Sequence, residues 1–196
     1  MDAGLTPLWI SVKTSLLATV ITFFLGIGTA YLVANYKGKW RGIIDSIFTL
    51  PLVLPPTVLG FFLLIFFGKN GPAGKFLLQF DINLIFTWTA TVISAVVVAF
   101  PMMYRSSRSA FEQIDDNLIA AAKTLGMSKW KIFYKISVPL AWPGIIGGVV
   151  LSFARALGEF GATLMMAGNI PGKTQTMPLA IFFQVQAMNY KGAMLW

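Results

Sequence analysis

The sequence predicts an all-α integral membrane protein, and two features of its composition carry that prediction. Of its 196 residues, 57% are hydrophobic and 11% are charged, whereas soluble domains carry roughly 25% charged residues. Apolar runs of about 20 residues, the length at which a helix crosses a bilayer, recur along the chain. We therefore expect residues 1–196 to form a single transmembrane domain with about five helices.

Four apolar runs predict complete transmembrane spans, at about residues 8–36, 43–67, 84–104 and 142–167. A fifth is expected to begin near residue 192, with the last span truncated in the sequence given. The N-terminal residues lack the basic leader of a signal peptide. We therefore expect the first apolar run to remain as a membrane helix.

The basic residues predict how these spans are oriented. Nine follow the first and third spans: Lys37, Lys39, Arg41, Arg105, Arg108, Lys123, Lys129, Lys131 and Lys135. The connections on the other side hold Lys69, Lys75, Lys173 and Lys191. Since cytoplasmic loops carry the excess of lysine and arginine, we expect the N-terminus outside. This bias explains the net charge of +8 more simply than an anionic partner does, and we expect no nucleic-acid binding.

Residue types that the chain lacks exclude several kinds of site. Cysteine and histidine are absent, which removes thiol nucleophiles, disulfides, the commonest general base and the usual zinc or haem ligands. No Lys-Ser/Thr pair stands at the spacing of a P-loop after Gly158 and Gly161, so these glycines do not form a phosphate-binding loop. We expect neither an enzyme nor a bound metal or cofactor.

The connection over about residues 105–141 is too polar to span a membrane, but its pattern is helical. Asp115 or Asp116 can cap a helix over 117–125, which is rich in good helix formers. Gly126 is suited to end that helix, and Ser128 can cap a second one. The segment predicts either an amphipathic element lying on lipid or a docking element for a soluble cytoplasmic protein.

The spacing within this connection favours docking. It resembles the cytoplasmic loop motif of permease subunits of bacterial ATP-binding cassette importers: Glu-Ala-Ala, three residues, Gly, nine residues, Ile-x-Leu-Pro. The candidate coupling residues are Ala120, Ala121, Ala122, Leu125, Gly126, Trp130, Ile136 and Pro139. Ala120 stands where the motif has Glu, and Val138 stands where it has Leu. The resemblance implies a coupling helix that sits in a groove of the ATPase subunit and transmits its movement to the spans.

The second apolar run contains three prolines, which interrupt backbone hydrogen bonding and persist at membrane depth where protein or a water-filled cavity satisfies the freed groups. This run is either a kinked packing helix or part of a translocation pathway, for which the candidates are Thr49, Pro51, Pro55, Pro56 and Thr57. Its sequence, LPLVLPPTVLG, resembles that of the molybdate permease branch of the importer family, with sulfate permeases as close relatives.

Arg155 and Glu159 lie four residues apart, so a helix places them on one face, and neither tolerates lipid. They form either a buried structural ion pair or a charged element at the pathway or subunit interface. The surrounding ARALGEFGAT, followed by GNIPGKT, is also similar to molybdate and sulfate permeases. Small residues at four-residue spacing, such as Gly26 and Ala30, permit close helix packing within one bundle or at a dimer seam.

The resemblance implies a bacterial or archaeal plasma-membrane subunit that forms, as a homodimer, the pathway of an importer for molybdate, with tungstate also a candidate. Its expected partners are a cytoplasmic ATPase that uses ATP, an extracytoplasmic oxyanion-binding protein, a second copy of the chain and membrane lipid. A sulfate or thiosulfate permease is the alternative. From a different class, a non-transporting membrane scaffold or insertion protein would use the basic loop to bind lipid or a partner without ATP.

Overall fold

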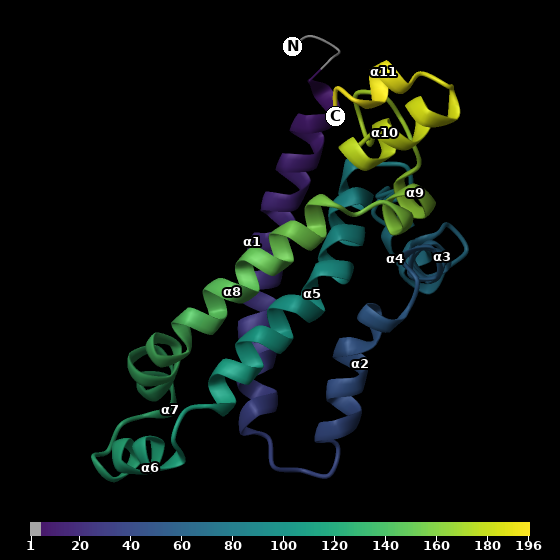
Figure 1. Cartoon of the computed structure of the whole chain (residues 1–196). Helices are drawn as coiled ribbons and strands as arrows, with labels where there is room; N and C mark the ends of the chain where they lie inside the picture. The colour runs from purple at the N-terminus through teal and green to yellow at the C-terminus, as the bar shows by residue number, and fades with distance from the viewer. Residues whose placement is uncertain (1–4) are drawn as a thin grey trace.

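The structure is a computed structural model, which describes residues 5–196; over that range the regular elements are helices. The predicted all-α class is therefore confirmed for this part of the chain. Three long helices, α1 (Thr6–Asn35), α5 (Trp88–Glu112) and α8 (Val138–Leu157), lie side by side and form the body of the molecule (Figure 1).

The core of this three-helix body is built from apolar side chains of all three helices. Its buried members are Ile27, Ala30, Val33, Met103, Tyr104, Phe111, Ala141 and Ile145. Glycines allow the helices to approach closely: a β-carbon at residue 26 would come within 2.6 Å of Met103 Cγ, and one at residue 144 within 2.5 Å of Ala110 Cβ. These small residues therefore pack within one chain, as one of the two interpretations of their spacing expects.

The second apolar run is divided into α2 (Arg41–Val53) and α3 (Pro56–Phe67), whose axes differ by 113°. The break lies at Leu54 and Pro55, which are both extended, with ψ angles of 135° and 137°. A residue before proline is disfavoured in helical conformation, and proline donates no backbone hydrogen bond. Pro51 lies in the last turn of α2 and does not end it. The expected span 43–67 is therefore not one continuous helix.

The third and fourth predicted spans also differ from the helices that contain them. Helix α5 continues to Glu112, so the connection expected to begin at residue 105 begins as helix; residues 105–112 contain no glycine or proline to stop it. Helix α8 begins at Val138, four residues earlier than expected, and ends at Leu157. A separate short helix, α9 (Gly161–Ala167), then follows, so the expected span 142–167 is broken near Gly158.

The remaining helices lie at the two ends of the body. Helices α6 (Asp116–Thr124) and α7 (Lys129–Ile132) lie at the same end as the connection between α1 and α2 (Figure 1). Helix α10 (Met177–Gln186) lies near the N-terminal end of α1. Met177 N, at the start of α10, donates a hydrogen bond to Ser11 Oγ of α1 at 2.7 Å. Helix α4 (Pro72–Leu78) follows α3, and α11 (Tyr190–Ala193) follows α10.

Among residues 5–196, three helical segments are long and apolar enough to cross a membrane. The bent pair α2–α3 makes a fourth if it counts as one span. The two connections predicted to face the cytoplasm lie at the same end of the molecule (Figure 1), which is the arrangement that the distribution of basic residues requires. Which end faces the cytoplasm stays a prediction.

Candidate functional site

Helix α6 begins and ends with capping motifs that its sequence specifies. Asp115 is the N-cap, and its carboxylate accepts a hydrogen bond from Asn117 N at 2.8 Å. At the other end Gly126 has a φ of 76°. Gly126 N donates to Lys123 O and Met127 N donates to Ala122 O, at 3.0 and 3.1 Å. These two bonds form a Schellman motif, which requires the left-handed conformation that glycine adopts without strain.

Helix α6 is largely uncovered, and its exposed residues include apolar ones. Of its nine residues, Ala122 is the one that is buried. Ala120 and Ala121 are exposed, and Leu125, directly after the helix, is 82% exposed. The alanines give this helix a thin face that another surface can approach closely. The part of the predicted motif up to Gly126 is therefore a rigid, projecting element whose apolar side chains are available to a partner.

The second half of the motif follows on α7 and the wide helical turn η1 (Phe133–Ser137). Ser128 Oγ accepts a hydrogen bond from Lys131 N at 3.4 Å and caps α7. The π-helical turn η1 is closed by Val138 N donating to Phe133 O; it directly precedes Pro139, which has no backbone N–H to donate. Ile136 is half-buried and Pro139 is exposed.

Trp130 lies apart from the exposed face of α6. Its ring stacks on Tyr134, with ring centres 6.1 Å apart, and it lines a groove against α1. The structure therefore divides the candidate coupling residues between two surfaces, one on α6 and one where α7 and η1 meet α1. Their roles in coupling stay predictions.

A charged cluster that the sequence analysis did not find ties α2 to α5 near the same end. Arg41 and Asp45 on α2 face Glu112 and Arg108 on α5, forming the pairs Arg41–Glu112 and Arg108–Asp45. Arg108 Nε also donates to Glu112 Oε1 at 2.7 Å. Tyr104 Oη donates to Asp45 Oδ1 at 3.0 Å. Each helix carries its two charges four residues apart, which is the signal that could have indicated the pairing.

The candidate pathway residues lie around the break between α2 and α3. Pro55, Pro56 and Thr57 are exposed, and no side chain caps the first turn of α3. Thr49 Oγ1 donates to Asp45 O at 2.8 Å, within α2. The hydroxyl of Thr49 is therefore occupied by its own helix, whereas the α3 end of the break is open.

The break in the second apolar run packs against the break in the fourth. A β-carbon at residue 161 would come within 3.1 Å of Pro56 Cβ and 3.0 Å of Thr57 N, so Gly161 at the start of α9 touches the start of α3. Gly60 in turn lies against the backbone of Ala162. The structure thus joins pathway candidates from two distant parts of the sequence.

Glu159 and Arg155 form an ion pair at this junction. Arg155 donates to Glu159 Oε2 at 2.9 Å, and Glu159 Oε1 accepts from Ala162 N at 2.8 Å. Glu159 is 2% exposed, whereas the Arg155 side chain is 28% exposed. Glu159 therefore does two things: it pairs with the end of α8 and satisfies a free backbone N–H in the first turn of α9. This geometry gives the pair a structural role, and its role in the pathway stays a prediction.

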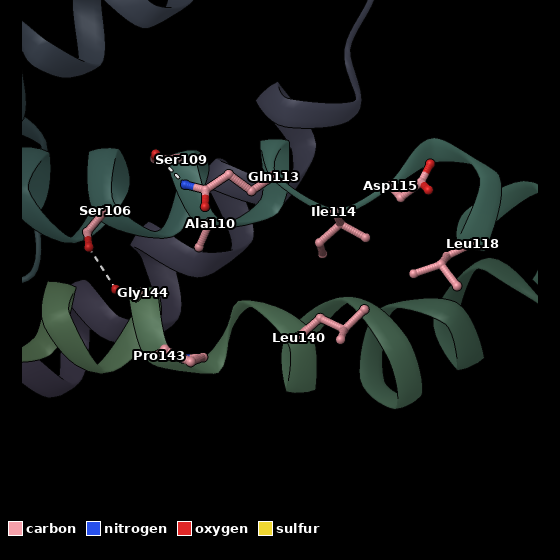
Figure 2. A pocket seen from close by; sticks show the side chains of 10 residues that line it. All are labelled: Ser106, Ser109, Ala110, Gln113, Ile114, Asp115, Leu118, Leu140, Pro143 and Gly144. Atoms are coloured by element: carbon pink, nitrogen blue, oxygen red, sulfur yellow. Dashed lines mark hydrogen bonds between the residues drawn. The ribbon is translucent and has the colours of Figure 1, made fainter.

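A pocket of about 680 Å³ lies between the C-terminal part of α5 and the start of α8 (Figure 2). Ser106 Oγ donates to Gly144 O at 2.7 Å along one wall, and Gln113 Nε2 donates to Ser109 Oγ at 3.3 Å. Asp115 is the one charged residue in the lining. Because its carboxylate would repel an oxyanion, we do not assign this pocket to the transported substrate.

The candidate coupling residues on α6 lie at one end of the body, and the pathway candidates around α3 and α9 lie farther along it (Figure 1). They form two separate sites joined by helices. Within residues 5–196, no group of three or more acidic side chains is placed to hold a metal ion.

The chain is similar in sequence to known transport permeases. The chain is 44% identical over 178 residues to the molybdenum transport system permease protein ModB of Escherichia coli K12, covering 90% of this chain and 78% of that protein. It is 47% identical over 163 residues to ModB of Haemophilus influenzae, covering 83% and 71%. The sulfate transport system permease protein CysT of Escherichia coli K12 is 33% identical over 94% of this chain and 66% of its own length.

The fold also matches a solved structure, that of a bacterial ABC transporter involved in the import of the acidic polysaccharide alginate. The TM-score is 0.80 at 14% identity, over 98% of this chain and 72% of the other, which establishes a shared fold. The relatives at 44% and 47% identity confirm the resemblance to importer permeases. Since residues 22–195 match the family described as binding-protein-dependent transport system inner membrane component, the chain belongs to that family of multi-pass membrane permeases.

Proposed function

We propose that this chain is the membrane subunit of an ATP-driven importer for molybdate, in which two copies enclose the pathway and two cytoplasmic ATPase subunits drive transport. The observation that carries this proposal is α6. It projects from the body, exposes the apolar side chains of Leu118, Ala120 and Ala121, and ends in a glycine cap at the position that the family motif requires.

The proposed mechanism follows from the helices that connect α6 to the pathway candidates. The ATPase subunits bind α6 and move it as they close on ATP. That movement reaches α8 through α7 and η1, and α8 ends at the Arg155–Glu159 pair beside the junction of α3 and α9. Rocking of such helix groups around a central site is a common route to alternating access.

ATP hydrolysis and oxyanion selection are carried out by separate partners of the proposed importer. ATP is bound and hydrolysed by the ATPase subunit, and this chain binds no cofactor. An extracytoplasmic protein selects the oxyanion and delivers it to the outer connections. The N-terminus lies outside, so that α6 and α7 face the cytoplasm. The lysines around α7 add electrostatic steering toward an acidic surface on the ATPase.

Molybdate is favoured over sulfate because of the difference in similarity. The permeases named for molybdenum transport are 44% and 47% identical to this chain, whereas the sulfate permease CysT is 33% identical. Tungstate has the same charge and tetrahedral shape as molybdate, so we include it as a possible substrate. Sulfate or thiosulfate is the second candidate.

The test is reconstitution of the chain with its ATPase and binding protein in proteoliposomes. We expect ATP-dependent uptake of molybdate that excess tungstate suppresses and excess sulfate does not. Suppression by sulfate alone would assign the chain to the second candidate. If the chain neither co-purifies with an ATPase nor supports uptake, it is a membrane scaffold and the proposed function is wrong.

A further inference from the structure

An apolar groove of about 570 Å³ lies between the second half of α1 and the segment formed by α7 and η1. Phe24, Gly28 and Leu32 contribute to its α1 wall, and Trp130 and Tyr134 contribute to the other. Phe24 and Leu32 are each 69% exposed, Trp130 is 71% exposed and Tyr134 is 64% exposed. These large side chains need an apolar partner that residues 5–196 do not supply.

The position of the groove indicates what covers it. Helix α1 is one of the helices long and apolar enough to cross a membrane, so the exposed apolar side chains of its wall face acyl chains. Trp and Tyr are enriched where a membrane meets water, which places the Trp130 and Tyr134 side of the groove at the interface. The groove therefore extends from the hydrocarbon region to the headgroup region.

The charge beside the groove selects among lipids. Lys129 is the one charged residue in its lining, and among residues 5–196 it has no carboxylate within ion-pair distance. The sequence from Asn117 to Gly158 contains four lysines and one arginine but no aspartate or glutamate. An anionic headgroup at Lys129 thus meets no competing negative charge from this segment.

We propose that this groove binds an anionic phospholipid, with an acyl chain along Phe24, Gly28 and Leu32 and the phosphate at Lys129. Basic pockets beside membrane helices recognise anionic headgroups, and one lysine near the surface contributes about 1 kcal/mol. The bound lipid would join α7 and η1 to α1 and would remove Trp130 from the surface available to a soluble partner. Lipid binding does not depend on transport, so it can be tested separately from the proposed function.

Gly28 provides a way to block the groove without disturbing the fold. Apart from its chain neighbours and the backbone of its own helix, a β-carbon at residue 28 would meet no atom of residues 5–196 within 4 Å, so Gly28→Leu should fill the groove rather than displace a helix. Gly42→Leu is its matched control, because residue 42 on α2 is equally open and lies outside the groove. Lys129→Gln removes the charge alone, and Lys173→Gln, in the connection between α9 and α10, is the control for loss of one lysine.

The test is native mass spectrometry of the full chain. The chain is extracted in detergent and incubated with an equimolar mixture of phosphatidylglycerol and phosphatidylcholine that have matched acyl chains. The unsubstituted chain and both controls should retain phosphatidylglycerol preferentially. Lys129→Gln should lower that preference about fivefold, as the loss of about 1 kcal/mol predicts. Gly28→Leu should lose both lipids.

An unchanged preference in Lys129→Gln would overturn the proposal, and so would equal lipid retention in Gly28→Leu and Gly42→Leu. If Gly28→Leu instead changes only the fraction of dimer, the groove is an interface with a second copy of the chain and the proposal is wrong. Displacement of the retained phosphatidylglycerol by inorganic phosphate would show a site for free phosphate alone, which also contradicts the lipid assignment.

Discussion

Gly60 of α3 lies so close to Ala162 of α9 that a β-carbon at residue 60 would come within 2.6 Å of the Ala162 Cα atom and 3.1 Å of its carbonyl oxygen. Neither atom can move without moving the backbone of α9. This contact holds together two helices whose parent spans are both broken, and it does so beside Pro56, Thr57 and Glu159.

Gly60→Ala should therefore destabilise the protein, by about 1–3 kcal/mol, because the added methyl group overpacks a close helix contact. Gly42→Ala, on α2, is the control: apart from its chain neighbours and its own helix backbone, its β-carbon would meet no atom of residues 5–196 within 4 Å. There the gain in helix propensity should raise stability by about 0.5–1 kcal/mol. The measurement is the midpoint of thermal unfolding in detergent. Equal shifts in the same direction would contradict the assigned contact.

Gly126 should be required for its backbone conformation and not because a side chain would lack room, since a β-carbon there would meet no atom of residues 5–196 within 4 Å beyond its chain neighbours. Gly126→Val should distort the end of α6, since a left-handed conformation costs about 1–2 kcal/mol for residues other than glycine. We expect ATP hydrolysis by the assembled importer to continue while uptake falls. The measurement is the ratio of oxyanion molecules transported to ATP hydrolysed.

Gly126→Asn provides the matched comparison, because asparagine tolerates the left-handed conformation better than other residues do. It should retain most of the coupling that Gly126→Val loses. Normal coupling in Gly126→Val would show that α6 does not need this cap. Equal loss in both variants would indicate that the glycine is needed for contact with a partner, not for its φ angle.

The pair Asp45–Arg108 should contribute measurably to stability, because both residues are partly buried and share a network with Tyr104 and Glu112. A double-mutant cycle with Asp45→Ala and Arg108→Ala should give a coupling energy of about 1 kcal/mol. The control is Lys37–Asp116, whose side chains are 88% and 93% exposed at a separation of 3.9 Å. That exposed pair should show no measurable coupling. The same value for both cycles would contradict a stabilising network.

Glu159→Ala should cost about 2–3 kcal/mol, because it leaves Arg155 without its partner and Ala162 N without an acceptor. The cost is below that of a fully buried pair because Arg155 is partly exposed. Glu159→Gln keeps an acceptor oxygen and should cost less. Thermal unfolding and uptake should be measured on the same preparations. Loss of uptake at unchanged stability would assign the pair to the pathway instead of to the junction of α8 and α9.

Local signals in the sequence were sufficient to predict α6, because its caps depend on residues a few positions apart. Asp115, Gly126 and Ser128 all have the predicted capping roles. The prolines likewise predicted an interruption in the second apolar run. The sequence could not predict the 113° angle at Pro55, since that angle depends on how α3 packs against α9, about one hundred residues later in the chain.

The features that sequence analysis missed depend on pairs that are distant along the chain. Arg41 meets Glu112 across 71 positions, and basic residues in a membrane protein are expected at the cytoplasmic side whether or not they pair. The end of α8 was missed for a different reason. Apolar character continues through residue 167, so the hydrophobic pattern conceals the break at Gly158 that Glu159 stabilises.

The unbroken helical backbone from Lys129 to Leu157 makes this segment a lever. It contains 29 residues, which correspond to roughly 43 Å at 1.5 Å per residue. Tilting such an arm by about 5° at its α7 end displaces its far end by roughly 4 Å, a distance comparable to the height of one helical turn. A small movement of α6, the helix proposed to bind the ATPase, would thereby be enlarged at Arg155 and Glu159. The wide turn η1, close to the driven end, is where such an arm would bend first.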